Sequence, residues 1–430
     1  MSKLSIPEPA PPGVAALHDE LRAFDALFAQ TSAIGATPAG GLHRLAASAE
    51  DGRARDLLRG WLAQNGFDVR IDAIGNLFGL ATFEPGAPYV LCGSHLDSQP
   101  SAGRFDGVFG VLAGAAAAAG VARRIRASGV RVPCNLAVVD WTNEEGARFQ
   151  PSLTGSSVFT GALPLDTAWA CTDAQGVTLR HALEQIGYLG EQMLDLPVAA
   201  YVEMHVEQAA HLEREALPIG VVRETWAALK LRVRFDGEQR HTGPTPMAER
   251  RDALLAAAHA ITAVYAEAGR HGKAMHSSVG RLDVYPNSPN VVPSCTTLHV
   301  EFRSPSTALL DEAATRFDAT LARIAQQTGT LVAIESRQLR APLALHAGLS
   351  QLAHEVSATL GLRSGDSVTV AGHDAISMSR VVPSCLLFVP SRGGISHSEA
   401  EFTDEADLHN GLRVLSALLQ RLCSESASYR

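Results

Sequence analysis

Four apolar runs, each ending in acidic or histidine side chains, constrain the fold of this chain more than any other feature of its sequence. The runs are PYVLCGSHLD, CNLAVVDWTNEE, AAYVEMHVEQ and CLLFVPSRGGISH. From about residue 50 to 220 such runs alternate with helical patterns, which is typical of a sheet covered by helices on both faces. Ligands of open α/β sheets bind just outside the carboxyl ends of the strands, so four strands deliver polar groups to the expected site.

The pattern changes between Ala227 and Gln338, where it predicts strand, helix, strand, strand, helix and strand. That order is the split, ferredoxin-like β-α-β-β-α-β unit. Thr245 is predicted to cap the first of its helices, with Pro246 at the first helical position. Because histidines follow strands on both sides of this unit, we predict one sheet domain, residues 1–224 and 341–430, interrupted by an inserted domain, residues 225–340.

The composition bounds the class of protein. A chain of 430 residues that is 46% hydrophobic and 19% charged can bury a large core and form two domains. The net charge of -9 comes from interspersed acids and bases, which argues against nucleic acid as a partner. Six cysteines without a Cys-x-x-Cys pair are typical of reduced, buried thiols.

Two segments bear on membranes and targeting. The first fourteen residues are polar and proline-rich, and they do not resemble a signal peptide. The longest apolar run, Val108 to Ala122, falls short of the roughly 18 residues of a membrane span and predicts a buried helix. We therefore expect a cytoplasmic protein without a membrane partner.

The segment GSHLDSQPSAGRFDG places His95 and Asp97 after a strand and Asp106 in a glycine-flanked loop before a helix. A histidine ligand needs its other ring nitrogen held by a carboxylate or a carbonyl, and Asp97 is placed to hold it. Read alone, His95 is more typical of an ordinary hydrogen-bonded histidine. The neighbouring carboxylates favour a metal ligand.

Glu144 and Glu145 follow the strand CNLAVVDWT, where neither can be buried without a cation or a proton. One of them can bind a metal while the other faces a water molecule, as metal-assisted hydrolysis requires. The alternative is a solvated acidic turn.

Two further histidines complete the candidate ligand set. His205 alternates with Glu203 and Glu207 along a strand, which predicts that all three point to the same side. His397 follows a strand and two glycines, so it can reach a shared site from its loop; the alternative is a surface histidine. Nitrogen and oxygen donors without thiolate suit zinc, manganese, cobalt or nickel. Five ligands exceed the needs of one tetrahedral ion, and a carboxylate such as Asp106 can bridge two ions about 3.5–4 Å apart.

The inserted unit carries its own polar cluster, which we interpret as substrate-binding. Arg303 offers a planar fork for a carboxylate, Asn290 offers an amide donor, and His241 can stabilise a developing oxyanion. A surface ion pair is an equally good reading of Arg303.

Together the motifs resemble the hydantoinase/carbamoylase family. This branch of the dizinc aminoacylase and carboxypeptidase superfamily contains N-carbamoyl-L-amino acid hydrolases, allantoate amidohydrolases and β-ureidopropionases. The resemblance covers nearly the whole chain and rests on motifs in family order: GSHLDSQP with GRFDG, TNEEGARF, HVEQ, HTGPTPM with RRDAL, PNSPNVVP, AGHDA and GISHSE. It implies an α/β, mixed-sheet, dizinc exopeptidase-like catalytic domain with an inserted ferredoxin-like dimerisation, or lid, domain.

The resemblance also implies roles for individual residues. It makes His95, Asp106 and His205 the ligands of one divalent ion, most simply zinc, and Asp106, Glu145 and His397 those of a second. Glu144 matches the catalytic general base, with His241 as a further catalytic group. The substrate-binding positions it implies are Gln208, His241, Asn290, Arg303 and Gly372. The resemblance further implies a homodimer formed through the inserted domain, in which His241 reaches the partner's active site.

The implied reaction cleaves the carbamoyl C–N bond of an N-carbamoyl amino acid to amino acid, ammonia and carbon dioxide. Glu144 takes a proton from water and returns it to the leaving nitrogen, while Arg303 holds the substrate carboxylate. Allantoate, ureidoglycolate or β-ureidopropionate hydrolysis by the same machinery is the nearest alternative, and dipeptidase or aminoacylase activity is more distant. A non-catalytic amino-acid-binding dimer predicts loss of a ligand or of the base, and none is missing.

Two departures from the family pattern concern the substrate more than the metals. Glu399 stands where proline commonly follows the histidine ligand, and PSLTGSS lacks the methionine and second glycine of the usual motif.

Overall fold

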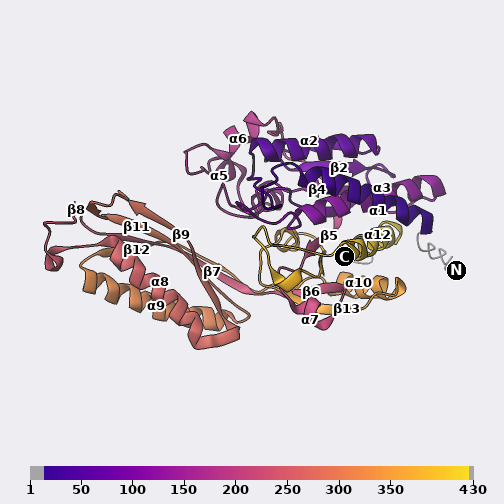
Figure 1. The fold of residues 1–430 in the computed structure, drawn as a ribbon. Coiled ribbons are helices and arrows are strands. Elements are labelled where there is room, and N and C mark those ends of the chain that lie inside the picture. The colour runs from indigo at the N-terminus through magenta and orange to yellow at the C-terminus, as the bar shows by residue number, and fades with distance from the viewer. Residues whose placement is uncertain (1–13, 426–430) are drawn as a thin grey trace. The chain divides into compact units, whose positions relative to one another are not determined.

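The computed structural model describes residues 14–425, so most of the segment used to judge a signal peptide lies outside the described residues. The chain divides into two compact units (Figure 1). The first unit comprises the described residues up to Arg223, Leu345–Ser367 and those from Gly372 onward. The second unit comprises Glu224–Ala344 and Val368–Ala371. Each unit has its own hydrophobic core.

An eight-stranded mixed sheet forms the centre of the first unit, in the order β1-β2-β4-β3-β5-β14-β6-β13. Strands β4, β3, β5 and β14 pair in parallel, whereas β1 with β2, β2 with β4, and β14 with β6 pair antiparallel. The predicted mixed-sheet α/β class is confirmed. The bounds are β1 (Asp68–Ile71), β2 (Leu77–Ala81), β3 (Tyr89–Ser94), β4 (Asn135–Asp140), β5 (Val198–Val206), β6 (Ile219–Thr225), β13 (Ser364–Thr369) and β14 (Ser384–Val389).

The four parallel neighbours are the four apolar runs that end in acids and histidines. Their carboxyl ends therefore meet at one edge of the sheet, where ligands bind in open α/β folds. Their burial patterns are almost continuous, as expected for parallel strands covered on both faces.

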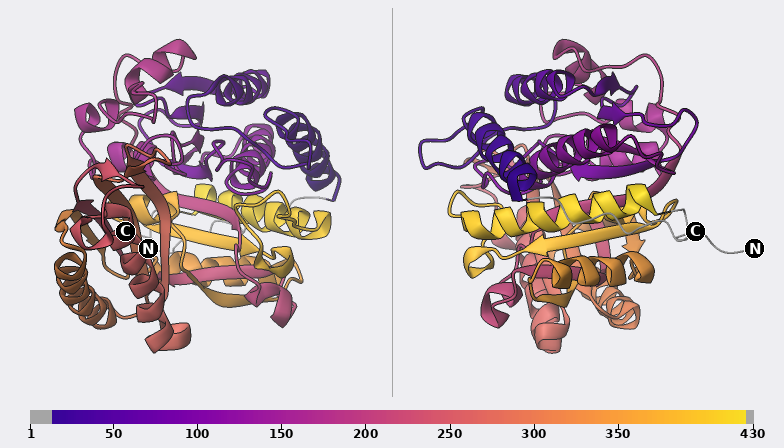
Figure 2. Two further views of the ribbon diagram at one scale, coloured as in Figure 1. Left: turned by 60° about the vertical axis from the view of Figure 1, so that its left-hand side comes forward. Right: turned by 90° about the vertical axis from the view of Figure 1, so that its right-hand side faces the viewer.

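Helices cover this sheet on both faces (Figure 2). Helices α3 and α12 pack against each other and against the central strands, while α4 and α11 pack together on the opposite face. There Phe159 of α4 contacts Phe78 of β2. The helices of the first unit are α1 (Val14–Ser32), α2 (Ala49–Gln64), α3 (Val108–Ser128), α4 (Thr154–Phe159), α5 (Leu165–Trp169), α6 (Leu179–Gln185), α7 (His211–Glu215), α10 (Ala347–Thr359), α11 (Asp374–Met378) and α12 (Glu405–Ser424), with a 3-10 turn η3 (Arg392–Gly394).

Helix α3 is longer than the apolar run that predicted it. It spans 21 residues and is long and apolar enough, by length and composition alone, to cross a membrane. However, 89% of its most apolar stretch is buried inside the protein. The helix continues past Ala122 through a more polar turn until Gly129, in the left-handed conformation, ends it. The expectation of a buried helix is therefore confirmed, although its predicted end is wrong.

The second unit has the predicted β-α-β-β-α-β order, formed by β7, α8, β9, β11, α9 and β12. Its four antiparallel strands lie in the order β12-β7-β11-β9, and both helices contact the sheet. The bounds are β7 (Ala227–Asp236), β8 (Arg240–His241), η1 (Met247–Glu249), α8 (Ala253–His271), η2 (Gly272–Ala274), β9 (His276–Tyr285), β10 (Val291–Val292), β11 (Cys295–Ser304), α9 (Thr307–Thr328) and β12 (Leu331–Arg340).

The predicted start of α8 is wrong. Pro246 precedes the short 3-10 turn η1, after which Arg250 adopts an extended conformation that interrupts the helical path. Asp252 is the actual cap, and its carboxylate accepts the backbone N–H groups of Leu254 and Leu255. Aspartate caps a helix at least as well as threonine does. The helix therefore begins after Asp252, which directly precedes it, and not after Thr245.

Candidate metal centre

Two clusters of ligand-type side chains share one carboxylate in the first unit. His95 and His205 lie with Asp106 in one cluster, and Glu145 and His397 lie with Asp106 in the other; within each cluster the donor atoms are within 4.8 Å of one another. Asp106 Oδ1 is 3.1 Å from His205 Nε2, whereas Asp106 Oδ2 is 3.2 Å from His397 Nε2. The two oxygens thus face different histidines, as a carboxylate that bridges two ions requires.

Every member of these clusters comes from the parallel edge of the sheet or from the helix that starts beside it. His95 follows β3, Glu145 follows β4, His205 lies in β5, and His397 lies in the loop after β14. Asp106 directly precedes the glycine that caps α3. The structure therefore brings together the five residues predicted as ligands.

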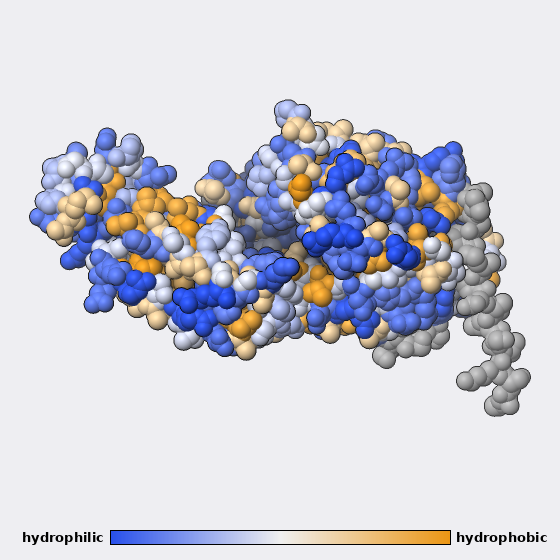
Figure 3. All heavy atoms as spheres, turned by 60° about the horizontal axis from the view of Figure 1, so that its bottom comes forward, coloured by the Kyte–Doolittle hydropathy of each residue, from blue (hydrophilic) through white to orange (hydrophobic). Residues whose placement is uncertain are grey.

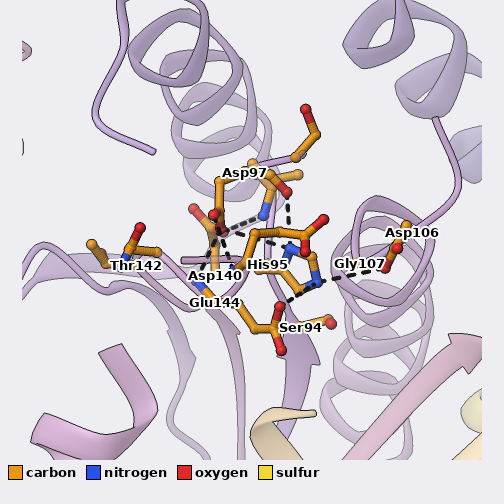
Figure 4. Close-up of polar contacts among 12 residues, drawn as sticks. Ser94, His95, Asp97, Asp106, Gly107, Asp140, Thr142 and Glu144 are labelled. Carbon is orange, nitrogen blue, oxygen red and sulfur yellow. Dashed lines mark hydrogen bonds and ion pairs between the residues drawn. The ribbon is translucent and has the colours of Figure 1, made fainter. Parts of the chain in front are cut away.

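Glu144 lies beside the first cluster, with its Oε2 atom 3.4 Å from His95 Nε2 (Figure 4). Its side chain is only 9% exposed. Burial and the neighbouring carboxylate of Asp374 raise the pKa of Glu144 well above its usual range. A carboxylate of raised pKa beside a cation site is suited to take up and return a proton.

Asp97 makes the predicted contact with His95, and it does so through its main chain. His95 Nδ1 is 2.9 Å from the backbone carbonyl of Asp97, and 3.6 Å from its carboxylate. That carboxylate instead accepts the backbone N–H groups of Glu144 and Glu145, at 3.2 and 3.3 Å (Figure 4). Asp97 therefore orients the histidine with its main chain and holds the two glutamates with its side chain.

Gly107 makes the approach of the two histidines possible. Its backbone N–H donates to His205 Nε2 at 3.1 Å, and its φ of +66° is one that L side chains rarely adopt. A Cβ at this position would lie 2.3 Å from the His95 ring.

Burial dominates the electrostatics of the site. It lowers the pKa of His95 to about 4 and, together with Asp106, raises that of Glu145 to about 7. Burial also works to lower the pKa values of His205 and His397, but their hydrogen bonds to Asp106 raise both to about 9. Several buried carboxylates thus share a small volume, and a cation bound among them would offset their mutual repulsion. Three imidazoles and two carboxylates, without a thiolate, fit divalent zinc or a similar ion.

Gln208, predicted to bind substrate, lies at the metal centre. Its Nε2 donates to Asp106 Oδ2 at 2.7 Å and to Ser396 Oγ at 3.2 Å. Its Oε1 is buried and has no hydrogen-bond partner among the described residues. Gln208 and His397 both have positive φ values, +57° and +53°, and such strain in non-glycine residues is concentrated at functional sites.

The other predicted substrate residues are distributed over both units. Gly372 belongs to the first unit and lies in the loop before α11. In the second unit His241 and Asn290 are neighbours: β8 pairs with β10, and Thr242 N donates to the Asn290 carbonyl at 3.2 Å. Arg303 donates to the Val370 carbonyl and, at 3.0 Å, to Glu301.

Glu207, predicted to point to the same side of its strand as Glu203 and His205, belongs to neither of the clusters at Asp106. Strand β5 ends at Val206, so the alternation stops there, and the Glu207 carboxylate accepts the backbone N–H of Leu212 at the start of α7. His373, which was not among the predicted site residues, forms a further cluster with Glu203 and His205, and all three of its members are buried. His373 lies in the AGHDA motif, but it is not part of an apolar run of the kind that identified the other histidines as ligands.

The comparisons with known proteins agree with this architecture. Residues 91–421 match the model of peptidase family M20/M25/M40. A Mycolicibacterium smegmatis protein named in broad terms as a hydrolase is 46% identical over 94% of either chain. The N-carbamoyl-L-amino-acid amidohydrolase of Rhizobium meliloti is 35% identical over 88% of this chain and 91% of its own. A hydantoinase/carbamoylase family amidase from Burkholderia vietnamiensis superposes with a TM-score of 0.89 at 38% identity, covering 94% and 98% of the two chains.

The chain therefore belongs to peptidase family M20/M25/M40. It is an amidohydrolase that acts on amide C–N bonds, and the predicted resemblance to the hydantoinase/carbamoylase family is confirmed.

Proposed function

We propose that this amidohydrolase hydrolyses the carbamoyl C–N bond of N-carbamoyl amino acids. The carbamic acid formed then loses carbon dioxide, so that the final products are the amino acid, ammonia and carbon dioxide. The observation that carries the proposal is the shared carboxylate of Asp106, whose two oxygens face different histidines beside the buried Glu144. The name of the Rhizobium meliloti relative supports this class of substrate.

His95, Asp106 and His205 would hold one divalent ion, and Asp106, Glu145 and His397 a second. The donor set favours zinc, with manganese, cobalt or nickel as alternatives. When bound, such ions polarise the scissile carbonyl and make water more acidic.

Glu144 is the proposed general base. Its buried carboxylate takes the proton of the attacking water and returns it to the leaving nitrogen. Asp97 keeps this carboxylate in place because it accepts the backbone N–H groups of Glu144 and Glu145.

Gln208, Asn290, Arg303 and Gly372 are proposed to bind the substrate. The unpartnered Oε1 of Gln208 is free to accept an N–H group. Arg303 is assigned to the substrate carboxylate because its guanidinium can bind both carboxylate oxygens.

We also propose that the protein is a homodimer formed through the second unit. Arg303 lies near the carboxyl end of β11. His241 lies in β8, which follows the end of β7 that pairs with Cys295 at the other end of β11. Arg303 lies eight positions after Cys295, which at the usual rise of a strand places the two ends roughly 27 Å apart. One second unit therefore cannot offer both side chains to a small substrate. His241, together with its neighbour Asn290, is assigned to the site of the partner subunit.

The surface of the second unit supports an interface. Leu254, Leu255 and Tyr265 of α8 are exposed, as are Leu282 and Tyr285 of the edge strand β9. Apolar side chains gather in patches on the face of this unit drawn in Figure 3. Exposed apolar patches of this kind are typical of protein contacts.

Allantoate or β-ureidopropionate hydrolysis is the second candidate, because the same metal and base residues serve those ureido substrates. A cytoplasmic location is also proposed. All six cysteines lie within the described residues and none of them forms a disulfide there, which suits a reducing compartment.

A substrate panel tests the proposal. Metal-free protein is reconstituted with zinc or manganese and incubated with N-carbamoyl amino acids, allantoate and β-ureidopropionate, and ammonia release is measured. Wild-type protein should release ammonia most rapidly from one N-carbamoyl amino acid. Glu144→Gln should bind metal normally but lose activity by a factor of 100 or more, on the order expected for loss of a general base. No turnover on any substrate of the panel would overturn the proposal.

A further inference from the structure

The loop after β14 carries two polar residues beside the metal centre that the predicted site does not include. Glu401 is buried, at 5% exposure. Its Oε1 accepts the backbone N–H groups of Phe105 and Asp106, both at 3.0 Å. Glu401 therefore holds the main chain that carries the shared carboxylate.

Ser396 connects Glu401 to the side chain of Asp106. Its Oγ lies 2.9 Å from Glu401 Oε2 and 3.1 Å from Asp106 Oδ2, and it accepts the Gln208 Nε2–H group. A serine hydroxyl has one proton, so it donates to only one of the two carboxylates at a time. The shorter contact is the one to Glu401.

The orientation of the Gln208 amide is fixed by the same group of atoms. With Nε2 toward Asp106, the amide donates to a carboxylate at 2.7 Å. The reversed amide would direct Oε1 at the carboxylate, where two acceptors would repel each other. Asp106 Oδ2 thus receives one hydrogen bond from Gln208, while Ser396, with its single proton, lies between Asp106 and Glu401 and is nearer to Glu401.

We propose that Ser396 and Glu401 are positioning residues for the second cluster, that of Asp106, Glu145 and His397. Glu401 draws the Ser396 proton away from Asp106 Oδ2 and so leaves that oxygen available to a cation, while it ties the His397 loop to the Asp106 loop. The inference rests on the proposed two-metal function. Ser396 and Glu401 affect the second ion more than the first, because Asp106 Oδ1, which faces His205, takes no part in these hydrogen bonds.

Glu399 offers a matched control in the same loop. Its carboxylate accepts the hydroxyl of Thr37, which in turn accepts the N–H of Gly41 at 3.0 Å. No hydrogen bond or ion pair recorded for Glu399 reaches Asp106, Gln208 or Ser396. Glu399→Gln removes the same charge as Glu401→Gln, two residues away, without touching the positioning contacts.

The experiment is a zinc titration of metal-free protein by calorimetry, with circular dichroism to verify folding. Wild-type and Glu399→Gln proteins should bind two ions per chain with matching affinities. Ser396→Ala and Glu401→Gln should weaken the second ion about 10- to 100-fold, as is usual for residues that orient a ligand, and leave the first within about threefold. In Glu401→Gln the new amide donates to Ser396 and turns its proton toward Asp106. Ser396→Thr, which keeps the hydroxyl, should restore the second ion.

Three results would overturn the inference. Both variants binding two ions with wild-type affinity would show that Ser396 and Glu401 do not position the centre. Equal weakening of both ions, or a lower melting temperature of the metal-free protein with unchanged zinc affinities, would show a general structural role. Wild-type protein that binds no second ion would contradict the two-metal function itself, and so is distinguishable from the other two.

Discussion

Gly107 is the residue whose identity the metal centre constrains most tightly. It combines a positive φ with a position directly against the His95 ring, so two separate demands exclude a side chain. Its N–H also donates to His205, which links both histidines of the first cluster to one peptide group.

Gly107→Ala is expected to weaken binding of the first zinc ion about 10- to 100-fold, because the new Cβ displaces the His95 ring. Gly129→Ala at the other end of α3 is the control: it also has a positive φ, +65°, but its Cβ would meet nothing within 4 Å. Gly129→Ala, in the left-handed region, should lose about 1–2 kcal/mol of unfolding free energy from backbone strain. Gly107→Ala should lose more, because its φ of 66° and ψ of -49° lie outside that region. Calorimetric zinc titration separates them, and unchanged affinity in Gly107→Ala would contradict the role assigned to His95.

The sequence predicts some residues of the site much better than others. His95, Glu145 and His205 could be found because each lies at the end of an apolar strand, where the fold itself indicates a site. Ser396 and Glu401 could not, because their partners lie nearly 300 positions away in the chain and no local pattern marks them. The contact of Asp97 with His95 was predicted, but the choice of carbonyl over carboxylate depends on loop geometry that a sequence does not reveal.

Helix α3 lies close to the sheet because small residues face the strands. A Cβ at Gly110 would lie 2.2 Å from the Met204 carbonyl of β5, whereas one at Gly114 would lie 3.4 Å from the Cys92 sulfur. At Gly110 there is no space for a methyl group next to the Met204 carbonyl oxygen. At Gly114 the space for a methyl group is almost sufficient.

Gly110→Ala should therefore lower the free energy of unfolding by about 1–3 kcal/mol or more, as overpacking against backbone usually does. Gly114→Ala should change it little or raise it by up to about 1 kcal/mol, because alanine favours the helix. Urea unfolding of metal-free protein measures both. Similar losses in the two variants would mean that helix α3 does not approach β5 more closely than β3.

At the level of elements, the order of strands and helices could be predicted but several boundaries could not. The β-α-β-β-α-β order follows from hydrophobic periodicity, which long elements display clearly. Thr245 and Asp252 are both good caps for α8. Which of them begins the helix depends on the path of the chain between them, which the sequence pattern does not reveal. The end of α3 was missed because polar residues continue a helix whose apolar run has stopped.

The whole molecule consists of two units with separate cores, and all five proposed metal ligands belong to the first. Removal of the metals should therefore destabilise one unit selectively. We expect a chelator to accelerate amide hydrogen exchange in β3, β4, β5 and β14, because their loops lose the cation that offsets buried carboxylates. Exchange in β7 and β11 should remain unchanged. Equal acceleration in both sets of strands would show that the units unfold together.

The proposed dimer leads to the most demanding prediction, because it assigns His241 and Glu144 of one active site to different subunits. His241→Ala and Glu144→Gln homodimers should each be nearly inactive. When the two variants are mixed, dissociated and reassociated, a mixed dimer has one site that combines the Glu144 of one subunit with the His241 of the other, and activity should return. In the alternative, in which each subunit supplies both residues, every site in the mixed dimer lacks one of them and no activity returns. Ammonia release before and after subunit exchange distinguishes the two arrangements. The double variant His241→Ala/Glu144→Gln mixed with wild type is a second test: exchange should lower activity if the site is shared, because both sites of that mixed dimer lack one residue, and should leave it unchanged otherwise.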